Sequence, residues 1–531
     1  MAARVGRVRP AIAALLAIVA LAIGLVPAAS TLTPARAASS DELKILSGPP
    51  TTLDPAVQGD AGSAAITAQL FETLTTFDTA LNLRPALAAS WQVDDAGRRV
   101  TFTLRPDLTF SDGSRLTAAD VVRSWLRLVD PRSPSPLASL MDPVAGAAPY
   151  RRGENADPAS VGLKAIDDSH VEVRLDRPAS DFPSIVASPT FGVVPPGVTG
   201  NGAGLAPATF VASGGYRLAN VSATELTLQA NSHYWAGTPA ISIVHLVTDI
   251  GGRSPVAAFE AGDVDYTPIS DADATWIAYS TTLGPQLRRV PSISLTYFGF
   301  DTRKAPFNDA RVRQAFAQAV DWPRMVNLGS SGSTVPATSM VPPGIVGRSG
   351  QDYLPAYDPS AARAALAAAG YPGGAGFPAV RLVTGGTGYE DAIVRELHDV
   401  LKVPVAFETM DFGSYFTRLA QDPPAFWALS WVADYPDQND FLGLLLGSGQ
   451  TNNYGRWSNP AFDAAIASAG STVDPAAQQS AYAAAQAVVA REVPVIPVAY
   501  DTGWALSRTG LLGAGQNGLG FLRLAGAAWQ P

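Results

Sequence analysis

Apolar and polar residues alternate with a period of two in some segments of the chain and follow a helical period in others. Residues 99–104 and 171–175 place an apolar side chain at every second position, as half-buried strands do. Residues 308–320 and 476–491 have helical spacing, with Asn308 as the expected cap of the first helix. Because such patterns follow one another along the whole chain, they predict an α/β or α+β protein with more than one sheet.

The most distinctive apolar run covers residues 426–437, with the sequence Phe-Trp-Ala-Leu-Ser-Trp-Val-Ala-Asp-Tyr-Pro-Asp. It is typical of a strand that brings the carboxylate of Asp434 to the start of a turn marked by Pro436. A carboxylate in that position can meet the positive charge of a ligand out of water. The alternative is that Asp434 only caps the turn. The first interpretation indicates binding and not catalysis.

Length and charge narrow the class of protein. A chain of 531 residues is too long for one compact domain, so two or three lobes are expected. Hydrophobic residues make up 47% and charged residues 16% of the chain, which indicates a folded protein. A formal net charge of −9 offers no basic stripe for phosphates and argues against nucleic acid as a partner.

The residues that usually carry metal or covalent chemistry are scarce. The sequence has no cysteine and 4 histidines, none of them paired at the spacing of helical metal ligands. The chain has no Gly-x-Ser-x-Gly elbow and no phosphate-binding loop ending in Gly-Lys-Ser/Thr. We therefore expect a protein without a metal, a cofactor or catalytic residues.

The first 37 residues have the order of a secretory signal. Arg4, Arg7 and Arg9 precede an apolar run over residues 11–26, and a small-residue stretch ends at Ala37. We expect cleavage after Ala37, with an uncleaved membrane anchor as the alternative. Without a cysteine after the signal, lipid anchoring by that route is excluded. The mature protein is expected in the periplasm or elsewhere outside the cytoplasmic membrane.

A series of short motifs extends in order over roughly residues 43–505. They occupy residues 110–122, 124–131, 228–235, 259–265, 297–301, 306–307, 311–316, 357–359, 370–372 and 459–463. Together they resemble the extracytoplasmic solute-binding proteins of ABC importers, specifically the oligopeptide/dipeptide-binding group, family 5. Any one of these motifs alone would be weak, but their order along the chain makes chance similarity a poor explanation.

The resemblance implies two α/β lobes that close on a ligand like a clamp, with an extra subdomain in the first lobe. We expect the first lobe at residues 38–270, its subdomain at about 65–190, and the second lobe at 271–500. Residues 501–531 should return to the first lobe. The implied function is delivery of peptides to the permease and ATPase subunits of an ABC transporter, by a monomer that is not an enzyme.

In peptide-binding relatives the ligand lies extended between two protein segments and pairs with their backbones, as an added strand does. The segment that matches one side here is Ser430, Trp431 and Val432, and Asp434 matches the carboxylate that binds the peptide amino group. Such a charge-assisted bond contributes about 1.5–3 kcal/mol.

The resemblance places the other side of the cleft at Asp60 and Ala61, where a turn or a helix start is nearly as consistent with the sequence. Leu137 matches a cleft position that is aromatic in a relative; a core position in the subdomain is the alternative. Ala428 stands where some relatives have a basic residue near the ligand carboxylate, so the partner of that carboxylate is not identified.

Strict alternation places Trp427 and Trp431 on one face of the strand. We expect Trp431 in the cleft and Trp427 in the core, an arrangement that would need a bulge or a bend.

Three other functions stay open. The solute could be a nickel chelate, haem, a sugar or an opine-like compound, although the scarcity of histidines lowers the metal options. The protein could be a degenerate family member that regulates envelope synthesis and transports nothing. A hydrolase is the remaining alternative, and the lack of a recognisable nucleophile argues against it.

Overall fold

The computed structural model describes residues 41–94, 97–133, 135–179, 181–198, 205–290, 292–329, 334–472, 474–514, 516–520 and 522–530. All of them belong to one compact unit, Ser39–Pro531. The predicted signal and the alternative anchor concern residues 1–37, which lie outside the described residues. None of the helices in the described ranges is long and apolar enough to cross a membrane.

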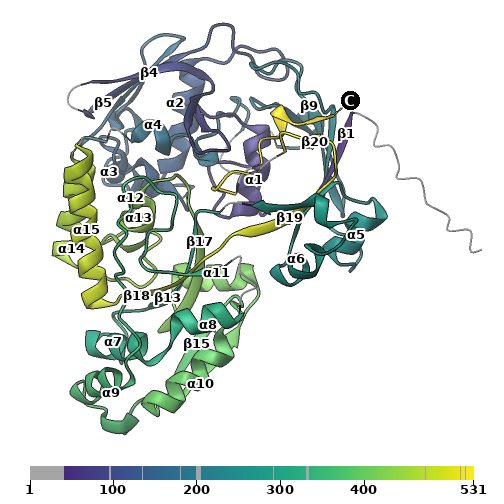
Figure 1. The fold of residues 1–531 in the computed structure, drawn as a ribbon. Helices are drawn as coiled ribbons and strands as arrows, with labels where there is room; N and C mark the ends of the chain where they lie inside the picture. Colours follow the sequence, from purple (N-terminus) through teal and green to yellow (C-terminus); the bar gives the residue numbers. More distant parts are fainter. Residues whose placement is uncertain are drawn as a thin grey trace, which may run out of the picture. The chain divides into compact units, whose positions relative to one another are not determined.

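The first large sheet has seven strands in the order β12-β19-β11-β1-β10-β9-β8. In Figure 1 the yellow strand β19 lies beside teal strands from much earlier in the chain. Strand β1 is parallel to β10 and β11, and the other pairs are antiparallel. The strands are β1 (Glu42–Leu46), β8 (Tyr216–Val221), β9 (Glu225–Ala230), β10 (Ile243–Val247), β11 (Tyr266–Ile269), β12 (Leu287–Val290) and β19 (Gly503–Ser507).

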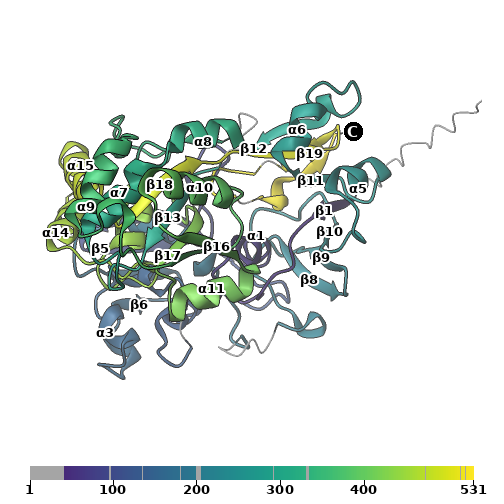
Figure 2. The same cartoon turned by 90° about the horizontal axis from the view of Figure 1, so that it is seen from below.

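The second large sheet has six strands in the order β14-β18-β13-β17-β15-β16. Its central strand β13 is antiparallel to β17 and β18, which lie on either side of it (Figure 2). Strand β15 is parallel to both β16 and β17. The strands are β13 (Ser294–Phe300), β14 (Val335–Pro336), β15 (Val380–Thr384), β16 (Val405–Thr409), β17 (Phe426–Val432) and β18 (Val495–Tyr500).

A third, four-stranded antiparallel sheet has the order β4-β5-β7-β6, and two short hairpins accompany the sheets. The strands are β2 (Thr75–Phe77), β3 (Leu83–Pro85), β4 (Ala88–Asp94), β5 (Arg99–Leu104), β6 (Leu163–Ala165), β7 (His170–Arg174), β20 (Leu511–Leu512) and β21 (Ala528–Trp529). The first large sheet includes β12, which lies beyond the predicted lobe limit at residue 270. The lobe and subdomain limits stay predictions.

The helices flank these sheets in sequence order. They are α1 (Ala61–Leu70), α2 (Ala118–Leu126), α3 (Ala147–Arg151), α4 (Phe182–Ile185), α5 (Pro255–Ala261), α6 (Asp271–Ile277), α7 (Ala310–Ala319), α8 (Trp322–Gly329), α9 (Pro359–Ala368), α10 (Glu390–Leu401), α11 (Phe412–Gln421), α12 (Gln438–Phe441), α13 (Gly443–Leu446), α14 (Pro460–Gly470) and α15 (Pro475–Glu492). A 3-10 helix, η3 (Ala138–Met141), precedes α3.

The expected elements are present with small differences at their ends. The predicted strand at 99–104 is β5, and the predicted helix at 476–491 is α15. The cap predicted for α7 is wrong by one residue, because Asp309 and not Asn308 accepts the hydrogen bond from the Arg311 N–H. Asn308 instead donates its own N–H to the Lys304 carbonyl, which leaves it outside the helix.

The six-stranded sheet is covered on both faces, and β13 is buried over its whole length. On one face Phe300, Phe316 and Phe426 pack together, with the rings of Phe300 and Phe426 stacked at 5.1 Å. On the other face Tyr297 and Trp427 meet edge to face at 5.6 Å. This second face belongs to a larger apolar cluster that also contains the core of the four-stranded sheet, so the candidate strand β17 lies where the two cores meet.

Candidate functional site

One edge of β17 has no strand neighbour over its last residues. On one side β13 pairs with the whole strand, from Phe426 to Val432. On the other side β15 pairs only with Phe426 and Trp427. The backbone of β17 beyond Trp427 therefore has no further strand on that side in the part of the chain that the structure describes.

The open edge presents the backbone groups of Ser430 and Val432. Residues of an antiparallel strand point their N–H and C=O alternately to one neighbour and to the other. The Ala433 N–H donates to the Ile293 carbonyl at 2.9 Å, on the β13 side. Ser430 and Val432 consequently face the opposite side, which a ligand backbone can join as an added strand. Ser430 is exposed and Val432 is half-buried.

Trp427 and Trp431 lie on the same face of β17, in the cluster that contains Leu429. The pairing of β13 with β17 is regular over its whole length. The inference that a bulge or a bend would be needed to give the two rings different surroundings is therefore wrong. They differ in depth and not in face, since Trp427 is 1% exposed and Trp431 is half-buried. Whether Trp431 contacts a ligand stays a prediction.

Asp434 follows β17 as a half-buried carboxylate that lacks a partner. Its Oδ2 atom is buried and accepts no hydrogen bond, and none of the described cations forms an ion pair with it. Burial raises the pKa of Asp434 to about 7, because a carboxylate away from water is costly to ionise. A cationic group placed here would relieve that cost.

Asp440, which sequence reasoning missed, holds the two predicted contact residues in position. This fully buried carboxylate accepts from Trp431 Nε1 at 2.8 Å and from the Asp434 backbone N–H at 3.3 Å. Burial, and then the charge of Asp434, raise its pKa well above the usual range. In the sequence Asp440 resembles an ordinary acid in the first turn of a helix, so it carries no signal of this role.

A second pair of carboxyl groups lies close to the first. Asp437 caps α12 through the Asn439 N–H at 2.7 Å and accepts from the Tyr482 hydroxyl at 3.1 Å. Burial, followed by the charge of Asp437, raises the pKa of Asp181 to about 7. The region around Asp434 is therefore rich in buried acids, and it favours cationic over anionic groups at that point.

Asp60 and Ala61 form the beginning of α1. The Asp60 carboxylate caps the helix, with Oδ1 accepting from the Ser63 N–H at 2.8 Å and Oδ2 from Thr51 Oγ1 at 2.6 Å. Ala61 is the first helical residue and is exposed. The helix start that the sequence left open is thus present, and the Asp60 side chain is already occupied. Contact of this segment with a ligand stays a prediction.

Leu137 lies in the large apolar cluster, 6% exposed. It directly precedes η3, and the preceding residue Pro136 packs against Gly59, where an added Cβ would come within 2.9 Å. The structure therefore brings the Asp60 segment close to Leu137. Trp431 packs against the same cluster. The side chain of Leu137 fits both of its predicted roles, as a cleft wall and as a core residue.

Ala428 has a buried side chain, 1% exposed, in the cluster on the face of the sheet opposite Trp431. Its backbone N–H donates to the Tyr415 hydroxyl at 3.2 Å. A basic residue at this position would be buried in an apolar core. The structure thus confirms no cation at 428, and another group must receive a ligand carboxylate if the ligand has one.

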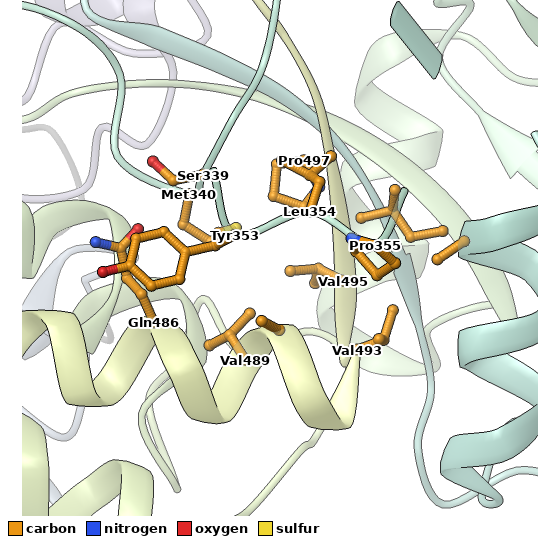
Figure 3. Close-up of a pocket in the computed structure, with 13 residues that line it drawn as sticks. Ser339, Met340, Tyr353, Leu354, Pro355, Gln486, Val489, Val493, Val495 and Pro497 are labelled. Carbon is orange, nitrogen blue, oxygen red and sulfur yellow. The ribbon is translucent and has the colours of Figure 1, made fainter. Parts of the chain in front are cut away.

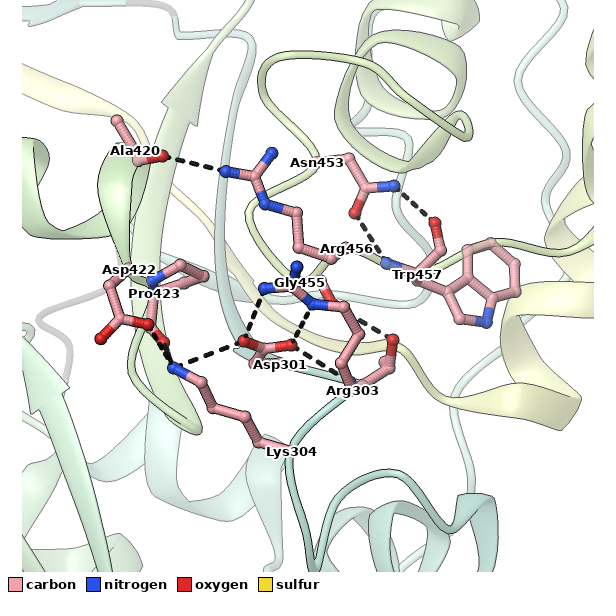
Figure 4. Close-up of polar contacts among 11 residues, drawn as sticks. Asp301, Arg303, Lys304, Ala420, Asp422, Pro423, Asn453, Gly455, Arg456 and Trp457 are labelled. Carbon is pink, nitrogen blue, oxygen red and sulfur yellow. Dashed lines mark hydrogen bonds and ion pairs between the residues drawn. The ribbon is translucent and has the colours of Figure 1, made fainter.

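The cations nearest to the end of β13 are occupied by the protein itself. Asp301 is fully buried, and Arg303 binds both of its oxygens at 3.1 Å. Lys304 Nζ lies 3.5 Å from the same carboxylate, and Arg456 donates to the Ala420 carbonyl at 2.9 Å. Figure 4 shows these contacts converging on the turn after β13. The Asp301 motif therefore stabilises a turn.

A pocket of about 390 Å³ opens next to the candidate site. Tyr435, which follows Asp434, lines it together with residues of η3 on one side and of α13 and α14 on the other. Leu140 of η3, one turn beyond Leu137, belongs to the same lining. The pocket thus connects the surroundings of Asp434 with the segment around Leu137.

A smaller apolar cavity of about 20 Å³ lies between α15 and β18 (Figure 3). Both amide atoms of Gln486 are buried there without a hydrogen-bond partner. This volume suits one water molecule, which needs about 10–15 Å³, and it is far too small for a peptide. In the described ranges, no group of three or more His, Asp or Glu side chains is placed to hold a metal ion.

Comparison with known sequences identifies the family. Residues 82–453 match the family described as bacterial extracellular solute-binding proteins, family 5. The chain is 30% identical over 468 residues to the probable deoxycholate-binding periplasmic protein YgiS of Escherichia coli, which covers 85% of this chain and 86% of that protein. It is 27% identical over 481 residues to the periplasmic oligopeptide-binding protein OppA of Salmonella typhimurium, covering 85% of each.

Solved structures share the fold. The murein tripeptide binding protein MppA of Escherichia coli superposes with a TM-score of 0.84 at 26% identity, covering 93% of this chain and 99% of that one. The unliganded open form of MppA gives a TM-score of 0.70. The predicted two-lobe α/β fold is thereby confirmed, and the relatives named above are binding proteins. Because the family match covers more than half of the chain, this protein belongs to the bacterial extracellular solute-binding proteins, family 5.

Proposed function

We propose that this protein binds peptides outside the cytoplasmic membrane and delivers them to the permease and ATPase subunits of an ABC transporter, acting as a monomer and not as an enzyme. The observation that carries the proposal is the buried, unpartnered Oδ2 of Asp434 at the end of an open strand edge. A peptide offers both complements, an ammonium group for the carboxylate and a backbone for the edge.

Backbone pairing explains how such a site accepts many sequences. Ser430 and Val432 would exchange main-chain hydrogen bonds with the ligand, and these do not depend on ligand side chains. Asp434 would set the register by fixing the amino end. Relatives named as oligopeptide-binding and murein tripeptide-binding proteins support this mode for the family.

Native mass spectrometry of the full-length protein, purified without denaturation, tests the proposal directly. We expect a mixed set of bound masses that correspond to short peptides. A single non-peptide mass would defeat the proposal.

The Asp434→Asn variant tests the amine anchor by titration calorimetry with alanine peptides of two to five residues. We expect affinity to fall at least tenfold, because a charge-assisted bond is worth about 1.5–3 kcal/mol. N-acetylated peptides serve as the control, since they carry no amine and should bind the variant and the original protein equally weakly. An unchanged affinity for the free peptides would show that Asp434 is not the anchor.

A second candidate ligand is a non-peptide amphipathic acid, because the relative YgiS is named as deoxycholate-binding. Leu137 and the apolar cluster around it would suit such a body. Asp434 disfavours an anion at its own position, however, and gives the peptide the better fit. Titration with deoxycholate separates the two, since it carries a carboxylate but no amine.

A further inference from the structure

The pocket beside Tyr435 contains a cation that the protein does not neutralise. Arg177 lines the pocket and forms no ion pair within 4.0 Å with any carboxylate in the described part of the chain. The one other arginine close by, Arg151, is 3.0 Å from Asp142 and satisfies that carboxylate. Arg177 therefore presents a guanidinium group whose donors are free for a ligand.

The position of Arg177 is fixed by its packing. Its Nη1 atom lies against the end of α14, where a Cβ added to Gly470 would approach it to 2.0 Å. Only glycine leaves room for the guanidinium at that point. An arginine held in this way loses little freedom when it binds, which favours recognition of a planar carboxylate.

A second polar group at the pocket also lacks a partner. Ser139 of η3 lines the pocket and is 6% exposed, and its Oγ is buried without a hydrogen bond. A buried hydroxyl without a partner costs about 1–3 kcal/mol. A ligand oxygen in the pocket would accept from Ser139 and from Arg177 together.

The neighbouring acids do not cancel this cation. Asp142 is paired with Arg151, and it also accepts from Gln450 Nε2 at 3.4 Å. Asp463 accepts from the Ser448 backbone N–H at 3.1 Å. Arg177 acts on the buried Asp181 only through its charge, which lowers the pKa that burial raises. Its direct hydrogen-bonding capacity is unused.

We propose that this pocket holds the carboxylate of the ligand, with Arg177 as its charge partner and Ser139 as a further donor. The proposal rests on the proposed function and deepens it. With Asp434 for the amine and Arg177 for the carboxylate, the preferred solute carries both charges, as a short peptide with two free ends does. It also supplies the charge partner that is absent at Ala428.

Titration calorimetry with paired alanine peptides of two to five residues, with a free or an amidated C-terminus, tests the proposal. On the original protein, amidation of the length that binds best should weaken binding at least tenfold. On Arg177→Gln this difference should shrink to less than twofold, while Arg177→Lys should keep part of it. Arg174→Gln is the matched control, because Arg174 is exposed on β7 and pairs with Glu172; it should discriminate as the original protein does.

Each other result has a defined meaning. Equal binding of free and amidated peptides to the original protein, or full discrimination by Arg177→Gln, overturns the carboxylate assignment and leaves the proposed function standing. No binding of any peptide overturns the proposed function and the inference with it. Deoxycholate that binds Asp434→Asn as well as the original protein, but not Arg177→Gln, would overturn the two-charge ligand, because it would assign Arg177 to an acid without an amine.

Discussion

Asp434 and Asp440 form a pair of buried carboxyl groups that share no cation in the described part of the chain. Placing two such groups next to each other is costly, since each raises the cost of ionising the other. The fold retains them because Asp440 orients Trp431 and the backbone of Asp434. At the scale of the residue, the site therefore stores a cost that a cationic ligand relieves, and activity and stability should oppose each other here.

The ligand-free protein should lose stability as pH rises from about 4 to about 7. The pKa of Asp434 is raised from 3.8 to about 7 in the folded state, so over this range the folded state binds more protons than the unfolded state, and stability falls with increasing pH. Asp434→Asn removes this cost, and we expect it to raise the free energy of unfolding at pH 8 by about 1–3 kcal/mol.

Urea unfolding of both proteins at pH 5 and pH 8 measures the effect. The difference between Asp434→Asn and the original protein should be larger at pH 8 than at pH 5. A variant that is less stable than the original at pH 8 would show that Asp434 makes a favourable internal contact.

At the scale of the element, β17 is a strand with one complete and one incomplete neighbour. Its pairing with β15 stops at Trp427, and the twist and length of β15 leave the remaining edge open. Open edges usually invite unwanted pairing. Here the edge is short and adjoins a buried carboxylate, so it is suited to one extended ligand.

Replacing Ser430 separates backbone from side-chain recognition. Ser430→Pro removes the outward N–H, and we expect at least a tenfold loss of peptide affinity with the fold retained, because proline is tolerated at a strand edge. Ser430→Ala removes only the hydroxyl, which contacts Thr296 Oγ1 at 2.7 Å, and should change affinity less than threefold. Calorimetry measures the affinities and circular dichroism the fold; equal effects of both substitutions would rule out strand addition.

At the scale of the whole molecule, segments far apart in sequence meet around the pocket. Gln450 Nε2 donates to Asp142 at 3.4 Å, and Thr451 Oγ1 donates to the Pro136 carbonyl at 3.4 Å. These long bonds are the weak kind that can break and form again. They link η3 and its surroundings to the loop before α14, so they are placed to favour a closed arrangement.

The double variant Gln450→Ala/Thr451→Val should therefore bind peptide about 2–10-fold more weakly, since each hydrogen bond contributes about 0.5–1.5 kcal/mol. Small-angle X-ray scattering should show a larger radius of gyration for the ligand-free variant than for the original protein, and a similar radius after saturation with peptide. Gln421→Ala, an exposed change at the end of α11, is the control. An unchanged radius and affinity would show that these contacts do not support closure.

The sequence by itself determined the local features of this protein. Alternation identified β5 and β17 and placed Trp427 and Trp431 on one face, because a strand turns its side chains by a fixed period. The apolar run before Asp434 identified an acid at the end of a strand. The ordered motifs indicated the family, which the family match confirmed.

Only the tertiary structure decided what surrounds these features. The open edge of β17 depends on where β15 ends, and the lack of a partner for Asp434 depends on every side chain folded around it. Arg177 and Ser139 reach the pocket beside Tyr435 from a segment more than 250 residues earlier in the chain. Local patterns report only near neighbours, whereas desolvation and charge pairing are set by long-range packing. The chemistry of this site is therefore a property of the fold, built on an acid that the sequence alone made visible.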